Sequence, residues 1–315
     1  MTAGLEFDPV EFEHRLRHSA LADSPVALHA SLLHVLESGG KRVRPILVYR
    51  FGSLCAGGAR PVGELALAVE MLHTATLVHD DIIDSADSRR GRPSLHLEHS
   101  IEVAILVGDL YVARCGVHLA ETEHPLAAHH VFSALDAMVR GELEQQQRRF
   151  DLSQTKDDYL HTIEQKTASL IAAACASAVL VSGGEEAQVL AARTYGHNLG
   201  LAFQVVDDVL DYTGSEDSIG KPAAGDIREG TVTLPLILAM DLSPAPVDAI
   251  LASARERGDY SAVVQAVRRS GAVERCVELA DQLTRDAIAA LRVFPEGPDR
   301  AALEELATSL ATRRA

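Results

Sequence analysis

The sequence predicts an all-α fold built from ten or more helices. Residues that start and stop helices recur along the whole chain, as Asp8 with Pro9 and Gly39 with Gly40 illustrate. Apolar residues repeat at helical spacing between these signals. No stretch alternates apolar and polar residues for long enough to predict a strand with assurance.

The helices follow one another in chain order. Asp8 is an N-cap residue and Pro9 suits the first helical position, so one helix is expected from there toward Glu37. Pro45 opens a second helix that runs to about Cys55. The segment 214–230 combines Gly, Pro and charge, which makes it the best candidate for a mobile lid. The other expected helices cover 61–84, 100–121, 125–150, 157–181, 185–212, 234–242, 247–257, 260–269, 273–293 and 300–313, with a basic loop at 89–93.

Length and composition indicate a single folded domain over residues 1–315. A chain of this length can bury a large core, and no Gly/Pro/Ser-rich linker or low-complexity tract divides it. The apolar fraction of 47% excludes global disorder. The net charge of −16 argues against nucleic acid as a partner. A phosphate-bearing substrate would therefore need local basic residues or metal ions.

The chain is expected to work in the cytoplasm without stable membrane insertion. Its four cysteines are far apart and form no CxxC pair, so neither a zinc site nor a disulfide framework is indicated. The N-terminal residues are acidic and lack the apolar core of a signal peptide. The uncharged segment 167–184 is rich in Ala and Ser, and its strongly apolar part is shorter than a spanning helix of about 20 residues. A buried core helix is the expected structure there.

Three carboxylates, Asp80, Asp81 and Asp84, end an apolar segment that predicts a buried helix. On a helix, Asp80 and Asp84 lie one turn apart on one face, about 6 Å along the axis. The C-terminal end of a helix carries about half a negative charge, so these acids repel the dipole and one another unless cations bind them. Taken alone, such a motif is more often a solvated helix end.

The same design recurs at Asp207, Asp208 and Asp211, after a second apolar helical run. Two such helix ends could face each other across a cavity. Carboxylate oxygens without Cys or His at ligand spacing suit Mg²⁺ rather than zinc. Mg²⁺ held by few carboxylates fills its other positions with water and substrate phosphate. A diphosphate substrate is therefore expected.

Basic residues accompany both motifs. Lys41, Arg42 and Arg44 lie at a predicted helix start, where free N–H groups and the dipole attract anions. Arg89 and Arg90 follow the first motif, and their planar guanidinium groups suit phosphate oxygens. Taken separately, these residues also fit solvated charges or simple ion pairs.

Two further lysines belong to this set. Lys166 precedes the uncharged helix, where a lysine can simply extend toward solvent, and Lys221 lies in the expected lid. Each is a weak signal by itself. Their occurrence together with two aspartate motifs is a strong one.

These motifs resemble those of the trans-isoprenyl (polyprenyl) diphosphate synthase family, and the match covers nearly the whole chain. The stretches that carry the resemblance are GGKRVRP (39–45), HTATLVHDDIIDSADSRRGRP (73–93), GD (108–109), KT (166–167), FQVVDDVLD (203–211) and GKPAAGDIREGTVTLP (220–235). They occur in the family's order and at its usual spacings. The resemblance implies an all-α barrel of helices around a deep central cavity (the isoprenoid synthase type), usually in a homodimer. It also implies a Mg²⁺-dependent prenyltransferase that adds isopentenyl diphosphate head-to-tail to an allylic diphosphate.

The resemblance further implies roles for individual residues. Mg²⁺, as three ions once diphosphate is bound, would be held by the motif aspartates, with Asp80, Asp84 and Asp207 as the expected direct ligands. The implied catalytic set is Asp80, Asp81, Asp84, Asp207, Asp208, Asp211 and Lys166. The residues that match allylic-diphosphate contacts are Arg89, Lys166, Thr167, Gln204 and Lys221. Those that match the isopentenyl-diphosphate site are Lys41, Arg44, His73 and Arg90.

One position departs from the family pattern. Many members carry Lys after the glycine where this chain has Gly230 and Thr231. One cation on the allylic diphosphate is then either missing or replaced by Arg228. His73 also fits a satisfied core histidine, and only the family match assigns it to a substrate. His79 either orients Asp80 or has no role.

The resemblance implies ionisation, condensation and elimination. Mg²⁺ would neutralise charge on the leaving diphosphate, the isopentenyl double bond would attack the allylic cation, and the departing diphosphate would take the proton. A dry, apolar pocket would protect the cation from water. No side-chain base is expected.

Product length is expected to depend on the helix before the first motif. Ala75 lies where short-chain members carry a large, often aromatic side chain. One helical turn of about 5.4 Å is comparable to one isoprene unit. An open position at Ala75 predicts a product of C20 or longer, with Leu72 or Tyr111 as a possible floor to the tunnel.

Two other functions are considered. A class I terpene cyclase shares the first motif, but its second metal motif has an Asn/Asp-Ser/Thr-Glu pattern that DDVLD lacks. A non-catalytic partner subunit of a heteromeric synthase often loses an aspartate motif, whereas this chain keeps both. The cyclase is distinguished by diphosphate release without isopentenyl diphosphate, and the partner subunit by inactivity of the chain alone.

Overall fold

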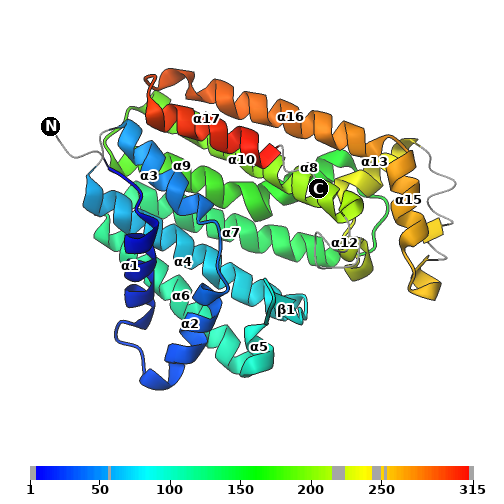
Figure 1. The fold of residues 1–315 in the computed structure, drawn as a ribbon, viewed down its shortest axis with the longest axis horizontal. Helices are drawn as coiled ribbons and strands as arrows, with labels where there is room; N and C mark the ends of the chain where they lie inside the picture. The colour runs from blue at the N-terminus through cyan, green and yellow to red at the C-terminus, as the bar shows by residue number, and fades with distance from the viewer. Residues whose placement is uncertain (1–4, 56–57, 215–223, 243–249, 252–253, 312–315) are drawn as a thin grey trace. The chain divides into compact units, whose positions relative to one another are not determined.

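The computed structural model describes residues 5–55, 58–214, 224–242, 250–251 and 254–311. Figure 1 shows that these residues are helical apart from one short hairpin and the connecting loops. The all-α prediction is therefore confirmed. The elements are α1 (Pro9–Leu21), η1 (Val26–Leu28), α2 (His29–Glu37), α3 (Val43–Leu54), α4 (Ala59–Ile83), β1 (Ser88–Arg89), β2 (Arg92–Pro93), α5 (Leu95–Glu98), α6 (Ile101–Glu121), α7 (Pro125–Gln147), α8 (Lys156–Ile163), η2 (Glu164–Ala168), α9 (Ser169–Val181), α10 (Glu186–Thr213), α12 (Gly225–Glu229), α13 (Leu234–Leu242), α15 (Ser261–Arg269), α16 (Ala272–Ala290), η3 (Leu291–Val293) and α17 (Pro298–Ala311).

The chain forms two compact units. The first unit comprises 1–133, 173–192 and 294–300, and the second comprises 134–172, 193–293 and 301–315. Helices α7, α9, α10 and α17 contribute residues to both units. The expectation of a single domain over 1–315 stays a prediction.

In the first unit, α4 packs along α6 and also against α3. Helix α4 carries the first aspartate motif and is buried along most of its length, as its all-round apolar sequence predicts. Leu65, Val69 and Leu72 of α4 are completely buried. The packing fixes the end of α4 and hence the position of the motif.

The second unit has its own core. Tyr159 of α8, Val205 and Val209 of α10, Leu236 of α13 and Cys276 of α16 belong to one cluster of buried side chains. The end of α10 that carries the second aspartate motif is anchored in this cluster. The helix expected over 247–257 lies partly outside the described residues, as does most of the expected lid.

The sequence prediction was wrong about the first helix. Asp8 does cap α1, since its carboxylate accepts hydrogen bonds from the backbone of Val10 and Glu11. The chain then leaves the helix after Leu21, and a second helix runs from His29 to Glu37. Asp23 adopts a left-handed conformation (φ 52°), and the following Pro25 has no N–H to continue a helix. These two residues explain the break.

Membrane-spanning potential is limited to one helix among the described residues. Helix α6 is long and apolar enough to cross a membrane, and 33% of its most apolar window is buried. Length and composition alone are weak evidence, because core helices of soluble proteins pass the same test. The uncharged helix α9 is almost wholly buried, so the prediction of a core helix there is confirmed.

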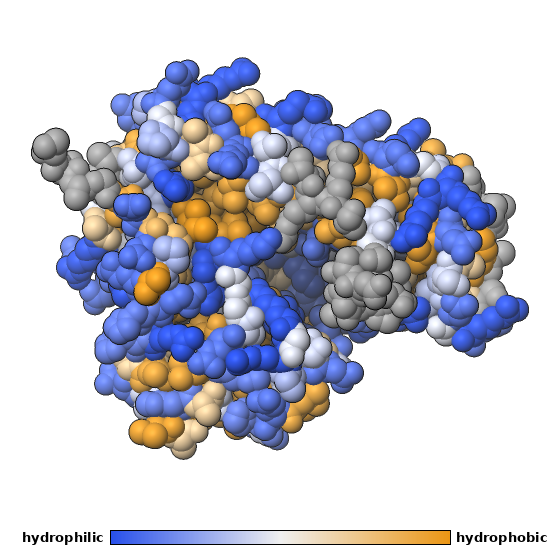
Figure 2. Space-filling view, viewed as in Figure 1, coloured by the Kyte–Doolittle hydropathy of each residue, from blue (hydrophilic) through white to orange (hydrophobic). Residues whose placement is uncertain are grey.

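The face of the molecule drawn in Figure 2 is largely hydrophilic over the described residues. On the face drawn in Figure 2, hydrophobic side chains form small groups among hydrophilic ones. This agrees with the strongly negative net charge of −16.

Candidate active site

The first aspartate motif lies at the C-terminal end of α4. Asp84 caps the helix, and its N–H donates to the carbonyl of Asp80 at 2.8 Å. Asp81 is buried, and its Oδ1 accepts hydrogen bonds from Arg89 Nε at 2.7 Å and Arg89 Nη2 at 2.6 Å. Arg89 therefore offsets part of the negative charge that the motif adds to the helix end.

Arg89 reaches the motif because the basic loop is a hairpin. Figure 1 shows this β1–β2 hairpin beside the end of α4. Its two turn residues, Arg90 and Gly91, have φ of 52° and 79°, as a tight two-residue hairpin turn requires. A Cβ on Gly40 would lie 2.9 Å from Arg90 Nη1, so the guanidinium of Arg90 lies against the backbone of the GGKR segment. The two basic stretches that the sequence singled out are thus neighbours.

Four arginines surround His73. Burial lowers the pKa of His73 well below its usual value, and the charges of Arg44, Arg90, Arg89 and Arg42 lower it further, in that order. His73 is therefore a neutral imidazole at physiological pH. Together these residues form a basic cluster in a chain of net charge −16.

Within this cluster, Arg42 and Arg44 differ. Arg42 forms ion pairs with Glu13 at 2.5 Å and with the buried Glu70 at 2.7 Å, so its charge is compensated by the protein. Arg44 Nε is buried and has no hydrogen-bond partner among the described residues. A buried donor without a partner costs free energy, and an anionic ligand would satisfy it. Lys41, the third cation of the segment, is exposed.

The candidate chain-length residues lie inside the first unit. Ala75 and Leu72 of α4 are completely buried, as is Tyr111 of α6, whose hydroxyl donates to the carbonyl of Leu32 at 2.8 Å. The hydrogen bond fixes the Tyr111 ring, which makes it a rigid wall rather than a movable side chain.

His79 has a packing role that the sequence left open. A Cβ on Gly108 of α6 would overlap the His79 imidazole, so the missing side chain at Gly108 admits the ring. His79 Nε2 also lies 3.6 Å from Asp109 Oδ1. Gly108 and Asp109 of α6 thus both lie against His79, the residue that precedes Asp80.

The second aspartate motif at the end of α10 is linked by hydrogen bonds to the Lys-Thr pair. Thr167 Oγ1 donates to Gln204 Oε1 at 2.9 Å, and Gln204 Nε2 donates to Asp208 Oδ1 at 2.8 Å. Tyr159 donates its hydroxyl hydrogen to the other oxygen of Asp208 at 2.6 Å. Asp208 is buried, whereas Asp207 is exposed.

A fourth carboxylate joins the second motif. Asp211 accepts backbone hydrogen bonds from Gly225 at 3.0 Å and from Asp226 at 3.3 Å, which brings Asp226 to the motif. Burial, together with the charges of Asp207 and Asp211, raises the pKa of Asp208 to about 7, although the hydrogen bonds from Tyr159 and Gln204 work to lower it. Burial and the charges of Asp208, Asp211 and Asp207 also raise the pKa of Asp226 well above its usual value.

The cluster of four carboxylates at the second motif has the chemistry that Mg²⁺ requires. Mutual repulsion among buried acids is relieved when a cation binds, and all the donors are oxygens, which Mg²⁺ prefers. Over the described ranges, no three His, Cys, Asp or Glu side chains converge to form a ready-made metal site. The sequence analysis quoted the stretch that contains Asp226 but assigned the residue no role, and it did not identify Tyr159. Only the folded structure brings both to the second motif.

Lys166 lies in η2, a π-helical stretch between α8 and α9. Such stretches inside helices frequently mark functional sites. Gly141 of α7 and Gly200 of α10 leave room for this π-helical stretch. A Cβ on Gly141 would lie 3.2 Å from Lys166 N, and a Cβ on Gly200 would lie 2.6 Å from Ala168 Cα. Lys166 Nζ forms an ion pair with Glu142 at 2.6 Å.

The remaining predicted residues divide as follows. Lys221 lies outside the described residues. Thr231 donates its backbone N–H to the carbonyl of Asp226 at 2.8 Å. The guanidinium of Arg228, considered as a replacement cation, lies 5.0 Å from the ring centre of Tyr260 and donates to the carbonyl of Gly258 at 3.2 Å.

Comparison with known proteins shows the family. A family model described as polyprenyl synthetase matches residues 25–269. Heptaprenyl diphosphate synthase component 2 of Geobacillus stearothermophilus is 38% identical over 91% of this chain and 90% of its own length. An all-trans-nonaprenyl-diphosphate synthase (geranyl-diphosphate specific) of Rhodobacter capsulatus is 37% identical over 92% of this chain and 90% of its own. The crystal structure of a polyprenyl synthase from Caulobacter crescentus, complexed with calcium and isoprenyl diphosphate, has a TM-score of 0.91 and 36% identity, covering 97% of this chain and 95% of that one. The chain therefore belongs to the polyprenyl synthetase family and is a prenyltransferase.

Proposed function

We propose that this chain adds isopentenyl diphosphate head-to-tail to an allylic diphosphate and makes a trans-polyprenyl diphosphate of C20 or longer. The observation that carries the proposal is the group of four arginines around the neutral His73. Arg42 and Arg89 form ion pairs with carboxylates of the chain, and the cations left over favour an anion of high charge, which a diphosphate is.

The isopentenyl diphosphate is assigned to this basic cluster. Arg44 offers its buried, unpartnered Nε to the diphosphate, and Arg90 lies close enough to Arg44 to lower its pKa. His73 stays neutral among the arginines, so it can accept or donate a hydrogen bond without adding charge. Lys41 is exposed and completes the set.

The allylic diphosphate is assigned to Arg89, Lys166, Thr167, Gln204 and Lys221. Lys166 supplies charge from the π-helical stretch, and Thr167 and Gln204 form one hydrogen-bonded pair that leads to Asp208. Lys221 enters on the family resemblance alone.

Asp80, Asp81, Asp84, Asp207 and Asp211 are the proposed Mg²⁺ ligands, with three ions bound in the presence of diphosphate. When bound, Mg²⁺ supplies Lewis acidity to the leaving diphosphate. Asp208 is buried and has both oxygens engaged by Tyr159 and Gln204, so it acts by orienting the motif. Asp226 adds negative charge beside these ligands.

The chain's apolar residues protect the reacting carbon centre. Ala75 and Leu72 of α4 are completely buried and apolar, so these two side chains present no water-holding group to the reacting carbon. Ala75 leaves room for a growing prenyl chain where a larger residue would block it, and Leu72 or Tyr111 is the proposed floor. The long prenyl chains in the relatives' names support a product of C20 or longer.

A homodimer is proposed from the exposed apolar side chains of the first unit. They lie on α5, α6 and the start of α7, and comprise Leu97, Ile101, Ile105, Leu106, Val117, Leu126 and Phe132. A second copy would cover this face. A heteromer is the second candidate, because one relative is named as a component of a synthase.

A cytoplasmic location is proposed because Cys55, Cys115, Cys175 and Cys276 are all free thiols.

The function is tested by diphosphate release from the purified chain with Mg²⁺ and farnesyl diphosphate. Release is expected only when isopentenyl diphosphate is added. Release from farnesyl diphosphate alone would instead indicate a cyclase. No release with both substrates would indicate that the chain needs a partner subunit.

A further inference from the structure

Arg149, just after α7, lies beside the position where this chain carries an uncharged threonine. Arg149 Nε donates to the backbone carbonyl of Glu229 at 2.7 Å, and Nη2 donates to the same oxygen. This carbonyl precedes Gly230 and Thr231 directly in the chain. The guanidinium is therefore held at the start of the Gly-Thr segment.

The same guanidinium is connected to Lys166 through two side chains of α7. Arg149 Nη1 donates to Gln146 Oε1 at 3.4 Å, and Gln146 Nε2 donates to Glu142 Oε1 at 2.8 Å. The other oxygen of Glu142 pairs with Lys166 Nζ at 2.6 Å. Two cations thus share one local network on the same unit.

Gln145 connects the other side of this network. Its Oε1 accepts from Lys166 Nζ at 3.4 Å, and its Nε2 donates to Thr231 Oγ1 at 3.5 Å. Together the contacts form a closed ring. Its members, in order, are Lys166, Glu142, Gln146, Arg149, the backbone from Glu229 to Thr231, and Gln145. Thr231 brings no charge to this ring, so Lys166 and Arg149 are its two cations.

The charge balance of the ring favours an incoming anion. Burial works to raise the pKa of Glu142, but the charge of Lys166, hydrogen bonds from Gln146 and Lys166, and the charge of Arg149 outweigh it, so its pKa lies below the usual value. Glu142 is therefore ionised and offsets one of the two cations. One positive charge remains, and Arg149 is exposed, with more N–H donors than the ring uses.

We propose that Arg149 binds the diphosphate of the allylic substrate together with Lys166 and supplies the cation that Thr231 does not. The inference rests on the proposed function, in that it takes Lys166 to be an allylic-diphosphate contact. It adds a binding residue, just after α7, that the motifs did not indicate.

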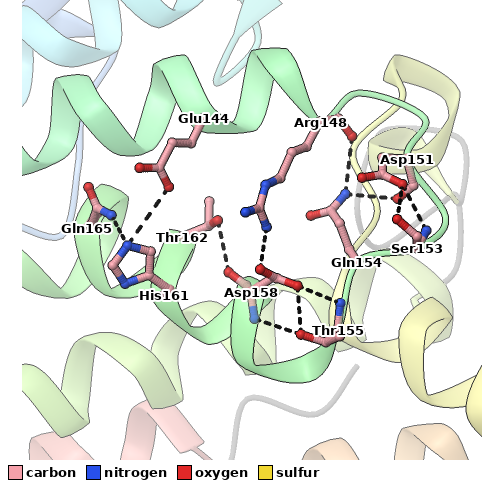
Figure 3. Close-up of polar contacts among 10 residues, drawn as sticks. All are labelled: Glu144, Arg148, Asp151, Ser153, Gln154, Thr155, Asp158, His161, Thr162 and Gln165. Carbon is pink, nitrogen blue, oxygen red and sulfur yellow. Dashed lines mark hydrogen bonds and ion pairs between the residues drawn. The ribbon is translucent and has the colours of Figure 1, made fainter.

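The neighbouring Arg148 provides a matched control. Figure 3 shows its side chain directed toward Asp158 of α8, with Nη1 2.7 Å from Asp158 Oδ1. Asp158 also forms the capping box with Thr155 that starts α8. Arg148→Gln and Arg149→Gln remove the same charge from adjacent positions, but only Arg149 belongs to the ring.

The test measures binding of inorganic diphosphate with Mg²⁺ by calorimetry, and KM for both substrates. Arg149→Gln is expected to weaken diphosphate binding and to raise KM for geranyl diphosphate about tenfold, which is the usual effect of losing one charge-assisted contact. KM for isopentenyl diphosphate should change little, and Arg148→Gln should leave all three quantities near the wild-type values. Adding Thr231→Lys to Arg149→Gln should restore binding, because it returns a cation to the same segment.

The inference would be overturned if Arg148→Gln and Arg149→Gln weakened diphosphate binding equally, or if Thr231→Lys did not restore this binding. Arg149 would then be only a structural contact of Glu229. Arg149→Lys, which keeps the charge, separates loss of charge from loss of folding. If the wild-type chain binds diphosphate but forms no product, the proposed function fails, while the binding comparison still decides the role of Arg149.

Discussion

Tyr159 of α8 donates its hydroxyl hydrogen to Asp208 of α10 across 2.6 Å. Gln204 occupies the other carboxylate oxygen at 2.8 Å, so Asp208 has protein donors on both sides. Asp207, its neighbour in the chain, is exposed instead. Burial thus separates Asp208, which the protein holds through both oxygens, from the exposed Asp207.

The first prediction concerns stability against pH in the absence of metal. Asp208 has a pKa of about 7 in the folded chain, above its ordinary value of 3.8. The folded state therefore binds a proton that the unfolded state releases, and stability falls as the pH rises from about 4 through 7. With EDTA present, we expect a higher melting temperature at pH 5 than at pH 8, and Asp208→Asn should reduce this difference. An unchanged pH dependence in Asp208→Asn would contradict the assignment to Asp208.

The second prediction concerns the protonation of His73. Burial and four arginines lower its pKa well below 6.5, so its imidazole should stay neutral at pH 6.5, where an ordinary histidine is half protonated. In the unfolded chain, His73 takes up a proton as the pH falls below 6.5, whereas in the folded chain it does not. The contribution of His73 to the free energy of unfolding is therefore lost only below that pH. Nitrogen NMR of labelled histidine should show no titration of His73 between pH 6.5 and about 8. A midpoint near 6.5 would mean that the arginines do not surround it.

The third prediction concerns Arg44. Arg44→Gln should raise KM for isopentenyl diphosphate about tenfold or more, because a charge-assisted hydrogen bond is lost. KM for the allylic primer should stay nearly constant. Arg50→Gln on the same helix is the control, since Arg50 forms an ion pair with Asp299 at 2.6 Å. Similar KM values in the two variants would remove Arg44 from the substrate site.

The fourth prediction concerns product length. Ala75 is completely buried in α4, so the graded series Ala75→Val, Ala75→Leu and Ala75→Phe fills the proposed tunnel step by step. The longest product should shorten along the series, with Ala75→Phe stopping at C20 or below. Overpacking costs about 1–3 kcal/mol of stability, so melting temperatures should accompany the product analysis. A folded Ala75→Phe enzyme with unchanged product length would refute the tunnel.

Most helices could be predicted from the sequence because their signals are local. Asp8 caps α1 as expected, and the expected range 234–242 coincides with α13. The break around Asp23 was missed because apolar residues continue on both sides of it. The turn at Arg90 and Gly91 was expected only as a loop, since its hairpin depends on left-handed conformations at both residues.

From the sequence, only those site residues that belong to recognisable motifs could be predicted. The aspartates and the Lys-Thr pair have recognisable spacing, but the π-helical stretch of Lys166 depends on glycines from two other helices. Tyr159 and Asp226 reach the second motif only through tertiary contacts. Arg149 likewise follows from where α7 ends relative to Glu229.

The most direct test of the central claim is chromatography of the products that the purified chain makes alone. The reaction contains Mg²⁺, labelled isopentenyl diphosphate and C5, C10, C15 or C20 allylic primers. We predict labelled trans-polyprenyl diphosphates of C20 or longer. No labelled product without a second protein, or a product that stops at C15, would contradict it.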